Sequence, residues 1–74
     1  MKFYTKKQCP LCEEAKDLLL SLQPEFTFQL EEIDIYEDDQ LLEAYQLMIP
    51  VIEVDEKQVT YGNIDLAAVI EALA

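Results

Sequence analysis

The 74-residue chain carries five lysines, no arginine and sixteen carboxylates, so its formal net charge is −11. Its length allows one domain, which we expect to span residues 1–74. Hydrophobic residues make up 51% of the chain and are spread along it, which predicts a compact fold rather than a disordered acidic segment. The negative charge argues against binding to nucleic acid or to anionic membranes.

The charge is unevenly distributed. Four of the five lysines lie within residues 1–16, whereas residues 17–56 contain twelve carboxylates and no basic residue. Among these lysines, Lys6 and Lys7 come just before the first cysteine. We hypothesise that they attract an anionic thiol or disulfide. The simpler alternative is that they are solvated surface residues without a ligand.

The first half of the chain predicts a strand, a helix and a second strand. Residues 2–5 are β-prone, and apolar residues with helical spacing follow Pro10, which suits a first helical turn. Pro24 ends this helix. Residues 26–35 alternate as a strand does, but the alternation shifts by one residue near Glu31 and Glu32, which predicts a bulge or a break there.

The second half predicts a short helix, a hairpin and a last helix. The short helix starts at the acidic residues 37–39 and its apolar stripe extends to Met48. Residues 49–54 and 57–61 form the hairpin, and the last helix is capped by Asn63 or Asp65. The predicted order is therefore β-α-β-α-β-β-α. No apolar stretch is long enough to cross a bilayer and no targeting segment is apparent, so we expect a cytoplasmic protein.

The two cysteines form a Cys9-Pro10-Leu11-Cys12 motif between the first strand and the first helix. Such a pair is typical of half a zinc site, of a redox dithiol or of two unreactive cysteines. Zinc requires four ligands, and the chain has no histidine and no other cysteine. The redox interpretation is favoured, because the free N–H groups of a helix N-terminus stabilise a thiolate. Cys9 is then the candidate nucleophile and Cys12 the candidate resolving thiol.

Several motifs occur together along the whole chain: Tyr4-Thr5-Lys6, the cysteine pair, Ile49-Pro50-Val51 before a strand, and Gly62-Asn63-Ile64-Asp65-Leu66 before the last helix. In this order the sequence resembles a glutaredoxin of the thioredoxin superfamily, and more narrowly the short bacterial glutaredoxin-like proteins of largely unassigned role. The resemblance implies an α/β, minimal thioredoxin-like fold with a four-stranded mixed sheet in the order 2-1-3-4. It also implies that the first and third helices share one face of the sheet and that the second covers the other.

The resemblance further implies a set of substrate-binding residues: Lys6, Pro10, Leu11, Ile49, Pro50, Gly62 and Asp65. Pro50 matches a cis-proline that packs against the cysteine pair, and Ile49 would offer its backbone to an extended substrate. Lys6 would contact a carboxylate of glutathione, and Asp65 would lie near the γ-glutamyl end of glutathione. Three positions depart from the family pattern, namely Met48, Tyr61 and Ile64, which argues against glutathione as the preferred substrate.

These features predict a thiol–disulfide oxidoreductase that acts on small or protein disulfides. We expect a monomer without a metal or prosthetic group, and with glutathione or a thioredoxin-reductase-type enzyme as the source of electrons. One alternative is a binding role, in which two monomers hold an iron–sulfur cluster through Cys9 and bound glutathione. The other is an adaptor that keeps the fold without catalysis.

Overall fold

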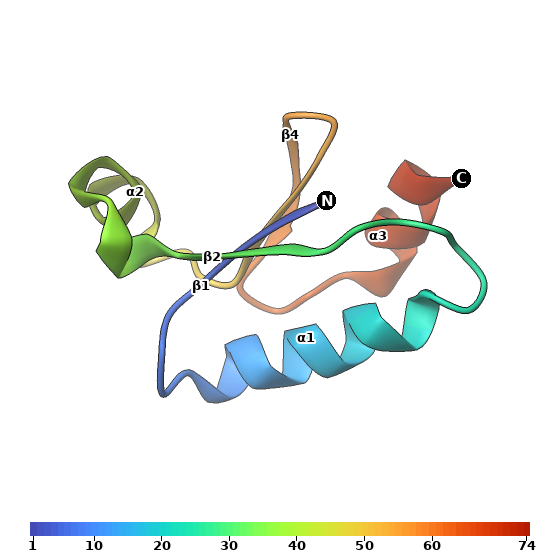
Figure 1. The fold of residues 1–74 in the computed structure, drawn as a ribbon, viewed down its shortest axis with the longest axis horizontal. Helices are drawn as coiled ribbons and strands as arrows, with labels where there is room; N and C mark the ends of the chain where they lie inside the picture. The colour runs from blue at the N-terminus through green and yellow to red at the C-terminus, as the bar shows by residue number, and fades with distance from the viewer.

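A computed structural model describes residues 1–74 and contains a four-stranded mixed sheet with helices on both faces (Figure 1). In chain order the elements are β1 (Lys2–Thr5), α1 (Pro10–Leu22), β2 (Glu31–Asp34), the 3-10 turn η1 (Ile35–Glu37), α2 (Asp39–Tyr45), β3 (Val51–Val54), β4 (Lys57–Tyr61) and α3 (Leu66–Leu73). The strand order is β2-β1-β3-β4, with β1 and β2 parallel and the other pairs antiparallel. The predicted fold class and strand order are therefore confirmed. No helix is long and apolar enough to span a membrane.

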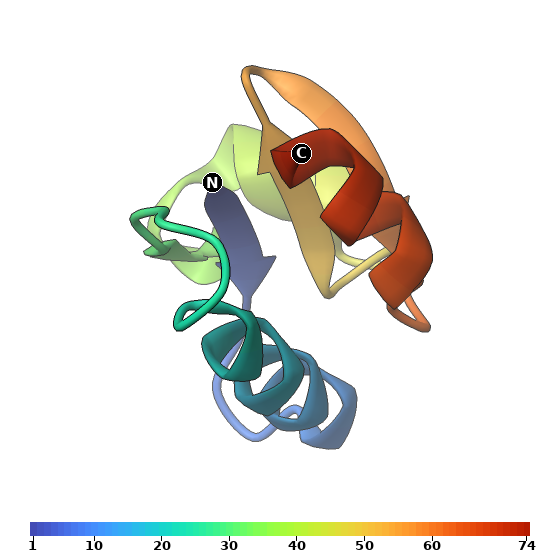
Figure 2. The ribbon, with the colours of Figure 1, turned by 90° about the vertical axis from the view of Figure 1, so that its right-hand side faces the viewer.

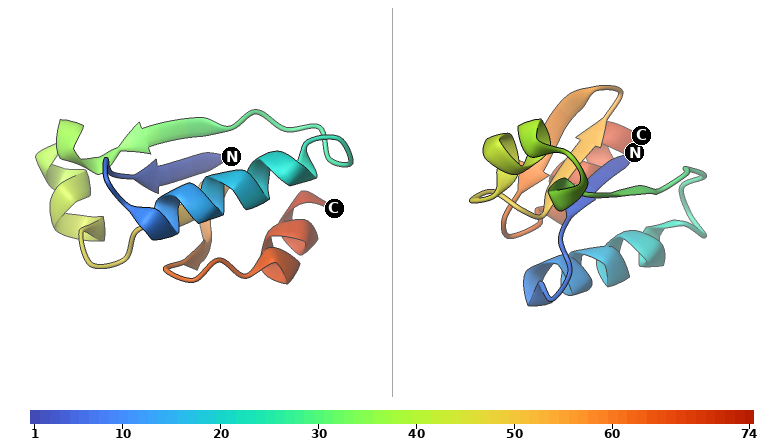
Figure 3. Two further views of the ribbon diagram at one scale, coloured as in Figure 1. Left: turned by 90° about the horizontal axis from the view of Figure 1, so that it is seen from below. Right: turned by 60° about the vertical axis from the view of Figure 1, so that its left-hand side comes forward.

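The alternation of side chains along the central strands divides the core between the two faces of the sheet. Phe3 and Ile52 pack with α1 and α3, whereas Tyr4 and Val51 pack on the opposite face. The helices contribute Ala15, Leu19 and Leu22 from α1 and Val69 from α3 to the first face, and Leu41, Leu42 and Tyr45 from α2 to the second. Figures 2 and 3 show α2 apart from α1 and α3. The predicted placement of the helices is correct.

Helix α1 follows the sequence signals closely. Pro10 occupies the first helical position, where its missing N–H removes no hydrogen bond. The helix ends at Leu22, two residues before Pro24. Four residues with helical spacing face the sheet and are buried, namely Cys12, Ala15, Leu19 and Leu22. The amphipathic pattern thus fixes both the length of the helix and the side that it turns to the core.

Strand β2 is shorter than the predicted strand over residues 26–35, because it begins only at Glu31. The register between β1 and β2 runs without a shift, so the change in alternation marks a break and not a bulge. Residues 26–30 have no strand to pair with, since β1 begins at Lys2. The chain is held there by the Met1 ammonium group, which donates to the carbonyl of Gln29 (3.1 Å).

The short helix also differs from its predicted extent, and η1 was not predicted. Helix α2 ends at Tyr45, because the chain then turns back and the N–H groups of Met48 and Ile49 both donate to the carbonyl of Tyr45 (2.8 and 3.1 Å). The strand predicted from residue 49 accordingly begins at residue 51. At the last helix, the structure decides between the two candidate caps: the Asp65 carboxylate accepts the N–H of Ala68 (3.2 Å).

The hairpin between β3 and β4 turns through two residues in the left-handed region, Asp55 (φ 52°) and Glu56 (φ 65°). Such two-residue turns match the twist of the strands and favour glycine or asparagine. A left-handed conformation costs other residues about 1–2 kcal/mol. The only register shift in the sheet lies between Ile52 and Glu53, so the bulge belongs to this hairpin.

We expect Glu56→Gly to raise the free energy of unfolding by about 0.5–1 kcal/mol, because glycine adopts the left-handed conformation without a steric penalty. The gain is smaller than the full penalty, since glycine also increases the conformational entropy of the unfolded chain. Urea denaturation followed by far-UV circular dichroism measures the change, since the chain has no tryptophan. Glu56→Ala removes the same charge without this freedom and serves as the matched control. An equal gain in both variants would assign the effect to charge instead.

Candidate functional site: the cysteine pair and its surroundings

One end of the sheet gathers the residues that the sequence singles out. Thr5 ends β1 and is paired with Asp34, the last residue of the parallel strand β2. On the other side of β1, Tyr4 is paired with Val51 of the antiparallel strand β3, which places Pro50 at the same end. The loop from Thr5 to Cys9 leads directly into α1. Helix α2 lies at this end too (Figures 1 and 3).

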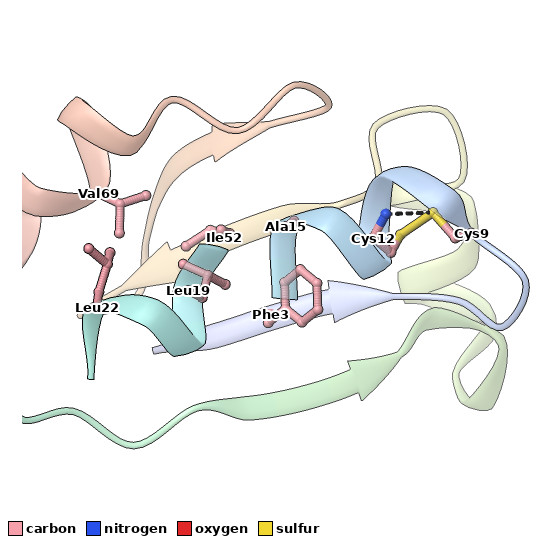
Figure 4. Packing of buried hydrophobic residues seen from close by; sticks show 8 residues of the cluster. All are labelled: Phe3, Cys9, Cys12, Ala15, Leu19, Leu22, Ile52 and Val69. Carbon is pink, nitrogen blue, oxygen red and sulfur yellow. Dashed lines mark hydrogen bonds between the residues drawn. A yellow bond between two sulfur atoms is a disulfide. The ribbon is translucent and has the colours of Figure 1, made fainter. Parts of the chain in front are cut away.

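Cys9 is the N-cap of α1, and Cys12 lies within the first turn. The Sγ atom of Cys9 accepts a hydrogen bond from the backbone N–H of Cys12 (3.1 Å), and the two cysteines form a disulfide with their Cα atoms 5.1 Å apart (Figure 4). Both side chains are buried, with 7% of Cys9 and 3% of Cys12 exposed. Gln8, just before the pair, is left-handed with φ 56°.

A polar pocket of about 500 Å³ opens beside the disulfide. Three lysines line it, Lys6 and Lys7 from the loop after β1 and Lys16 from α1. Its carboxylates are Glu13 of α1, Glu32 and Asp34 of β2, and Glu37 of η1. Lys16 and Glu32 form an ion pair across it (2.9 Å), and Lys6 and Lys7 form none. A ligand in this pocket would thus meet both signs of charge next to the sulfur atoms.

The opposite flank of the site is built around Pro50. The Ile49–Pro50 peptide bond is cis and the Pro50 side chain is buried. The N–H of Gly62 donates to the carbonyls of Met48 (3.0 Å) and Pro50 (2.9 Å). Gly62 adopts φ 67°, a conformation that a residue with a Cβ rarely takes. The turn after β4 is therefore attached to the segment before β3.

The predicted site residues fall into separate groups. Lys6 lines the pocket together with the two cysteines, whereas Ile49, Pro50 and Gly62 form the opposite flank. The remaining three are exposed and line no pocket with the cysteines: Pro10, Leu11 (46% exposed) and Asp65. The Asp65 carboxylate is already used as the cap of α3, so its position has a structural explanation.

Sequence reasoning did not anticipate Lys16, Asp34 and Glu37 as part of the site. Asp34 had a usable signal, because the carboxyl ends of parallel strands meet at one edge of a sheet, and functional residues often gather there. Lys16 and Glu37 had none, since only packing brings the second turn of α1 close to η1. No cluster of three or more histidine, cysteine or carboxylate side chains has the geometry of a metal site.

A cluster of two tyrosines and a carboxylate lies on the α2 face of the sheet. The hydroxyl groups of Tyr4 and Tyr45 donate to the two oxygens of Glu53 (3.2 and 3.0 Å), and the tyrosine rings are 4.8 Å apart. Burial, followed by the charge of Glu53, raises the pKa of Tyr4 to about 12. Burial and the hydrogen bond to Glu53 also raise the pKa of Tyr45. Both tyrosines are therefore held as neutral donors to the carboxylate.

The sheet, the helix arrangement and the cysteine pair at the start of α1 define a thioredoxin-like protein of the glutaredoxin type. Residues 1–74 match the family model described as "Glutaredoxin-like domain (DUF836)", and the chain belongs to this family.

Solved structures agree with this assignment. The chain is similar to protein Ne2328 from Nitrosomonas europaea, whose solution NMR structure gives a TM-score of 0.87 at 31% sequence identity and covers 99% of this chain and 88% of that protein. It is also similar in fold to thioredoxin 1 from the thermophilic eubacterium Thermosipho africanus TCF52B. That comparison gives a TM-score of 0.63 at 17% identity and covers 96% of this chain and 85% of the thioredoxin.

The tyrosine cluster predicts a loss of stability at alkaline pH. An acid with a raised pKa in the folded state stabilises the fold below its unfolded pKa of 10 and loses this contribution as the pH rises to 12. We expect the unfolding free energy of the wild type to fall by up to about 2–3 kcal/mol more than that of Tyr4→Phe over this interval. The other titrating groups are present in both proteins, so the difference reports on Tyr4 together with its coupling to Tyr45. Parallel curves from pH 8 to pH 12 would contradict the assignment.

Proposed function

We propose that the protein is a thiol–disulfide oxidoreductase in which Cys9 is the nucleophile and Cys12 the resolving thiol. The observation that carries the proposal is the N–H of Cys12 aimed at the Sγ atom of Cys9 (3.1 Å). A hydrogen bond donated to sulfur at a helix N-terminus favours the thiolate over the thiol, and the thiolate is the attacking species. Membership of the glutaredoxin-like family supports the same function.

The reaction balances through one mixed disulfide. The Cys9 thiolate attacks one sulfur of a substrate disulfide, whose S–S bond breaks and whose other sulfur leaves as a thiolate. The Cys12 thiolate then attacks the Cys9 sulfur, forms the Cys9–Cys12 disulfide and releases the second substrate thiolate. The substrate gains two electrons, and its thiolates take two protons from solvent. A dithiol or two monothiols must then reduce the Cys9–Cys12 disulfide.

The different positions of the two cysteines support the order of attack. Cys9 is the N-cap, outside the first turn, and is the more exposed of the pair. Cys12 lies inside the turn, and its own N–H points at Cys9, so its sulfur does not receive this stabilisation. Cys9 is therefore suited to attack the substrate disulfide. Cys12 is suited to attack the Cys9 sulfur of the mixed disulfide that results.

The proposed substrates are small or protein disulfides. The protein would act on them as a monomer, in a reducing compartment such as the cytoplasm. Glutathione or a thioredoxin-reductase-type enzyme would restore the dithiol. Lys6 and Lys7 lie beside the disulfide on an otherwise acidic protein, which supports preference for anionic partners among small disulfides. No prosthetic group is needed for these steps.

The order of attack predicts different behaviour for the two cysteine variants. Cys12→Ser should accumulate a mixed disulfide through Cys9, because the resolving thiol is missing. Cys9→Ser should lose turnover entirely. Incubation of each variant with hydroxyethyl disulfide, followed by intact-mass spectrometry, detects the adduct. An adduct that forms on Cys9→Ser and not on Cys12→Ser would reverse the proposed roles.

The lysines predict a charge-dependent selectivity. We expect Lys6→Gln to lower kcat/KM for glutathione disulfide, which is anionic, about twofold to fivefold, the range of a partly screened surface charge. The neutral hydroxyethyl disulfide should be reduced at an unchanged rate. Lys57→Gln makes the same charge change at the far end of the sheet and is the matched control. Equal effects of the two variants would show that net charge, and not the pocket, decides the rate.

A further inference from the structure

The resolving cysteine does not receive the stabilisation that the start of α1 gives to Cys9. The N–H of Cys12 donates to the Sγ atom of Cys9 (3.1 Å), and the Sγ atom of Cys12 accepts no hydrogen bond. The Cys12 side chain is also the more buried of the two, with 3% exposed. Burial disfavours a thiolate, yet the thiolate is the species that attacks a mixed disulfide. A positive charge near Cys12 would offset this effect of burial.

Lys16 is the lysine best placed to supply that charge. It follows Cys12 by four residues in α1, a spacing that brings two side chains of a helix to the same face. Both residues line the pocket beside the disulfide. The Nζ atom of Lys16 is held by a carboxylate oxygen of Glu32 in β2 (2.9 Å). Lys6 and Lys7 lie in the loop after β1 and form no ion pair, so no carboxylate fixes their ammonium groups.

Glu32 has two opposite effects on Lys16. The ion pair joins β2 to α1 and so keeps the ammonium group at the pocket, but the carboxylate also cancels part of its charge. Both side chains are nearly half exposed (44% and 45%), so water partly screens their effect on the sulfur. The charged groups that line the pocket with Cys12 are Lys6 and Lys7 of the loop, Glu13 and Lys16 of α1, Glu32 and Asp34 of β2, and Glu37 of η1. Among these groups Lys16 and Glu32 alone form an ion pair, so removing either one leaves the charge of the other unopposed.

We propose that Lys16 promotes the resolving step, because its charge stabilises the Cys12 thiolate, and that Glu32 holds Lys16 in place and weakens that charge. The proposal rests on the proposed function and concerns its second half. In this step the Cys12 thiol gives its proton to solvent, and the resulting thiolate attacks the Cys9 sulfur. The bond between Cys9 and the substrate sulfur breaks, and the substrate leaves as a thiolate. Lys16 and Glu32 keep their charges throughout.

The titration of Cys12 tests the proposal without catalysis. Cys9→Ser leaves Cys12 as the only thiol, keeps a good cap on α1 and, like the mixed disulfide, has no charge at the cap. Carbon NMR of the Cys12 Cβ atom gives the midpoint of the titration. In this background we expect Lys16→Gln to move the midpoint to higher pH and Glu32→Gln to lower pH, by about half a pH unit each. Lys16→Arg keeps the charge and should leave the midpoint in place.

The opposite signs distinguish this role from a structural one. An ion pair that only joins α1 to β2 is broken equally by both substitutions, so both would move the midpoint in the same direction. Lys57→Gln and Glu56→Gln make the same two charge changes in the β3–β4 hairpin and should move the midpoint less than half as far. Shifts of the same sign, or shifts no larger than those of the hairpin variants, would overturn the proposal.

The resolving step should show the same effect in its pH dependence. A single turnover of the reduced protein with hydroxyethyl disulfide, quenched with acid and analysed by intact-mass spectrometry, measures how fast the mixed disulfide disappears. A thiol with a midpoint half a pH unit higher has about threefold less thiolate at low pH, but each thiolate is more reactive. We therefore expect Lys16→Gln to resolve the mixed disulfide about twofold more slowly below the midpoint and slightly faster above it. Slower resolution at every pH would indicate a structural defect and overturn the proposal.

The two measurements separate failure of this proposal from failure of the proposed function. A protein that forms no mixed disulfide through Cys9 would reject the proposed function, whereas the titration of Cys12 would still report on Lys16 and Glu32. Opposite shifts of the titration, combined with equal resolution rates in the wild type and both variants, would overturn the role of the pair in the resolving step. The proposal holds only if the titration and the resolution rates change together.

Discussion

The pairing of β1 on both sides is the constraint on which the rest of the structure depends. Because β2 runs parallel to it and β3 antiparallel, the end of β2 and the start of β3 meet at the end of β1. The chain leaves β1 there and enters α1 through Cys9. The sulfur atoms, the acidic residues of β2 and the segment before Pro50 are thereby brought to one edge of a small protein.

The cysteine pair has two chemically different flanks. Lysines and carboxylates line the pocket on the β2 side, so this flank offers charge to a small polar molecule. On the β3 side the buried Pro50 and the half-buried Ile49 are apolar. The two sides of the disulfide therefore differ in polarity. The net charge of the chain is −11, and three of its five lysines line the pocket beside the disulfide. The positive charge of the protein is therefore concentrated on one flank of the cysteine pair.

Much of the fold was predictable where local chemistry and burial act on the same residues. Pro10 and Pro24 bracket α1, and its buried residues recur with helical spacing. The prediction failed where the pairing of one strand with another decides the conformation of a segment. Residues 26–30 alternate as a strand does, yet β1 is too short to pair with them. The left-handed turn at Asp55 and Glu56 has no glycine to mark it, so only the strand pairing reveals its type.

The sequence by itself determined the order of the elements and the placement of Cys9 at a helix start, because capping, amphipathic spacing and proline act over a few residues. Tertiary structure alone decided what surrounds the sulfur atoms. Asp34 and Glu37 line their pocket through strand pairing, and Tyr45 reaches Glu53 through the packing of α2 on the sheet. These contacts join residues far apart in the chain, and no local pattern encodes them. The physical reason is that a hydrogen bond between distant residues forms only once the sheet has set their separation.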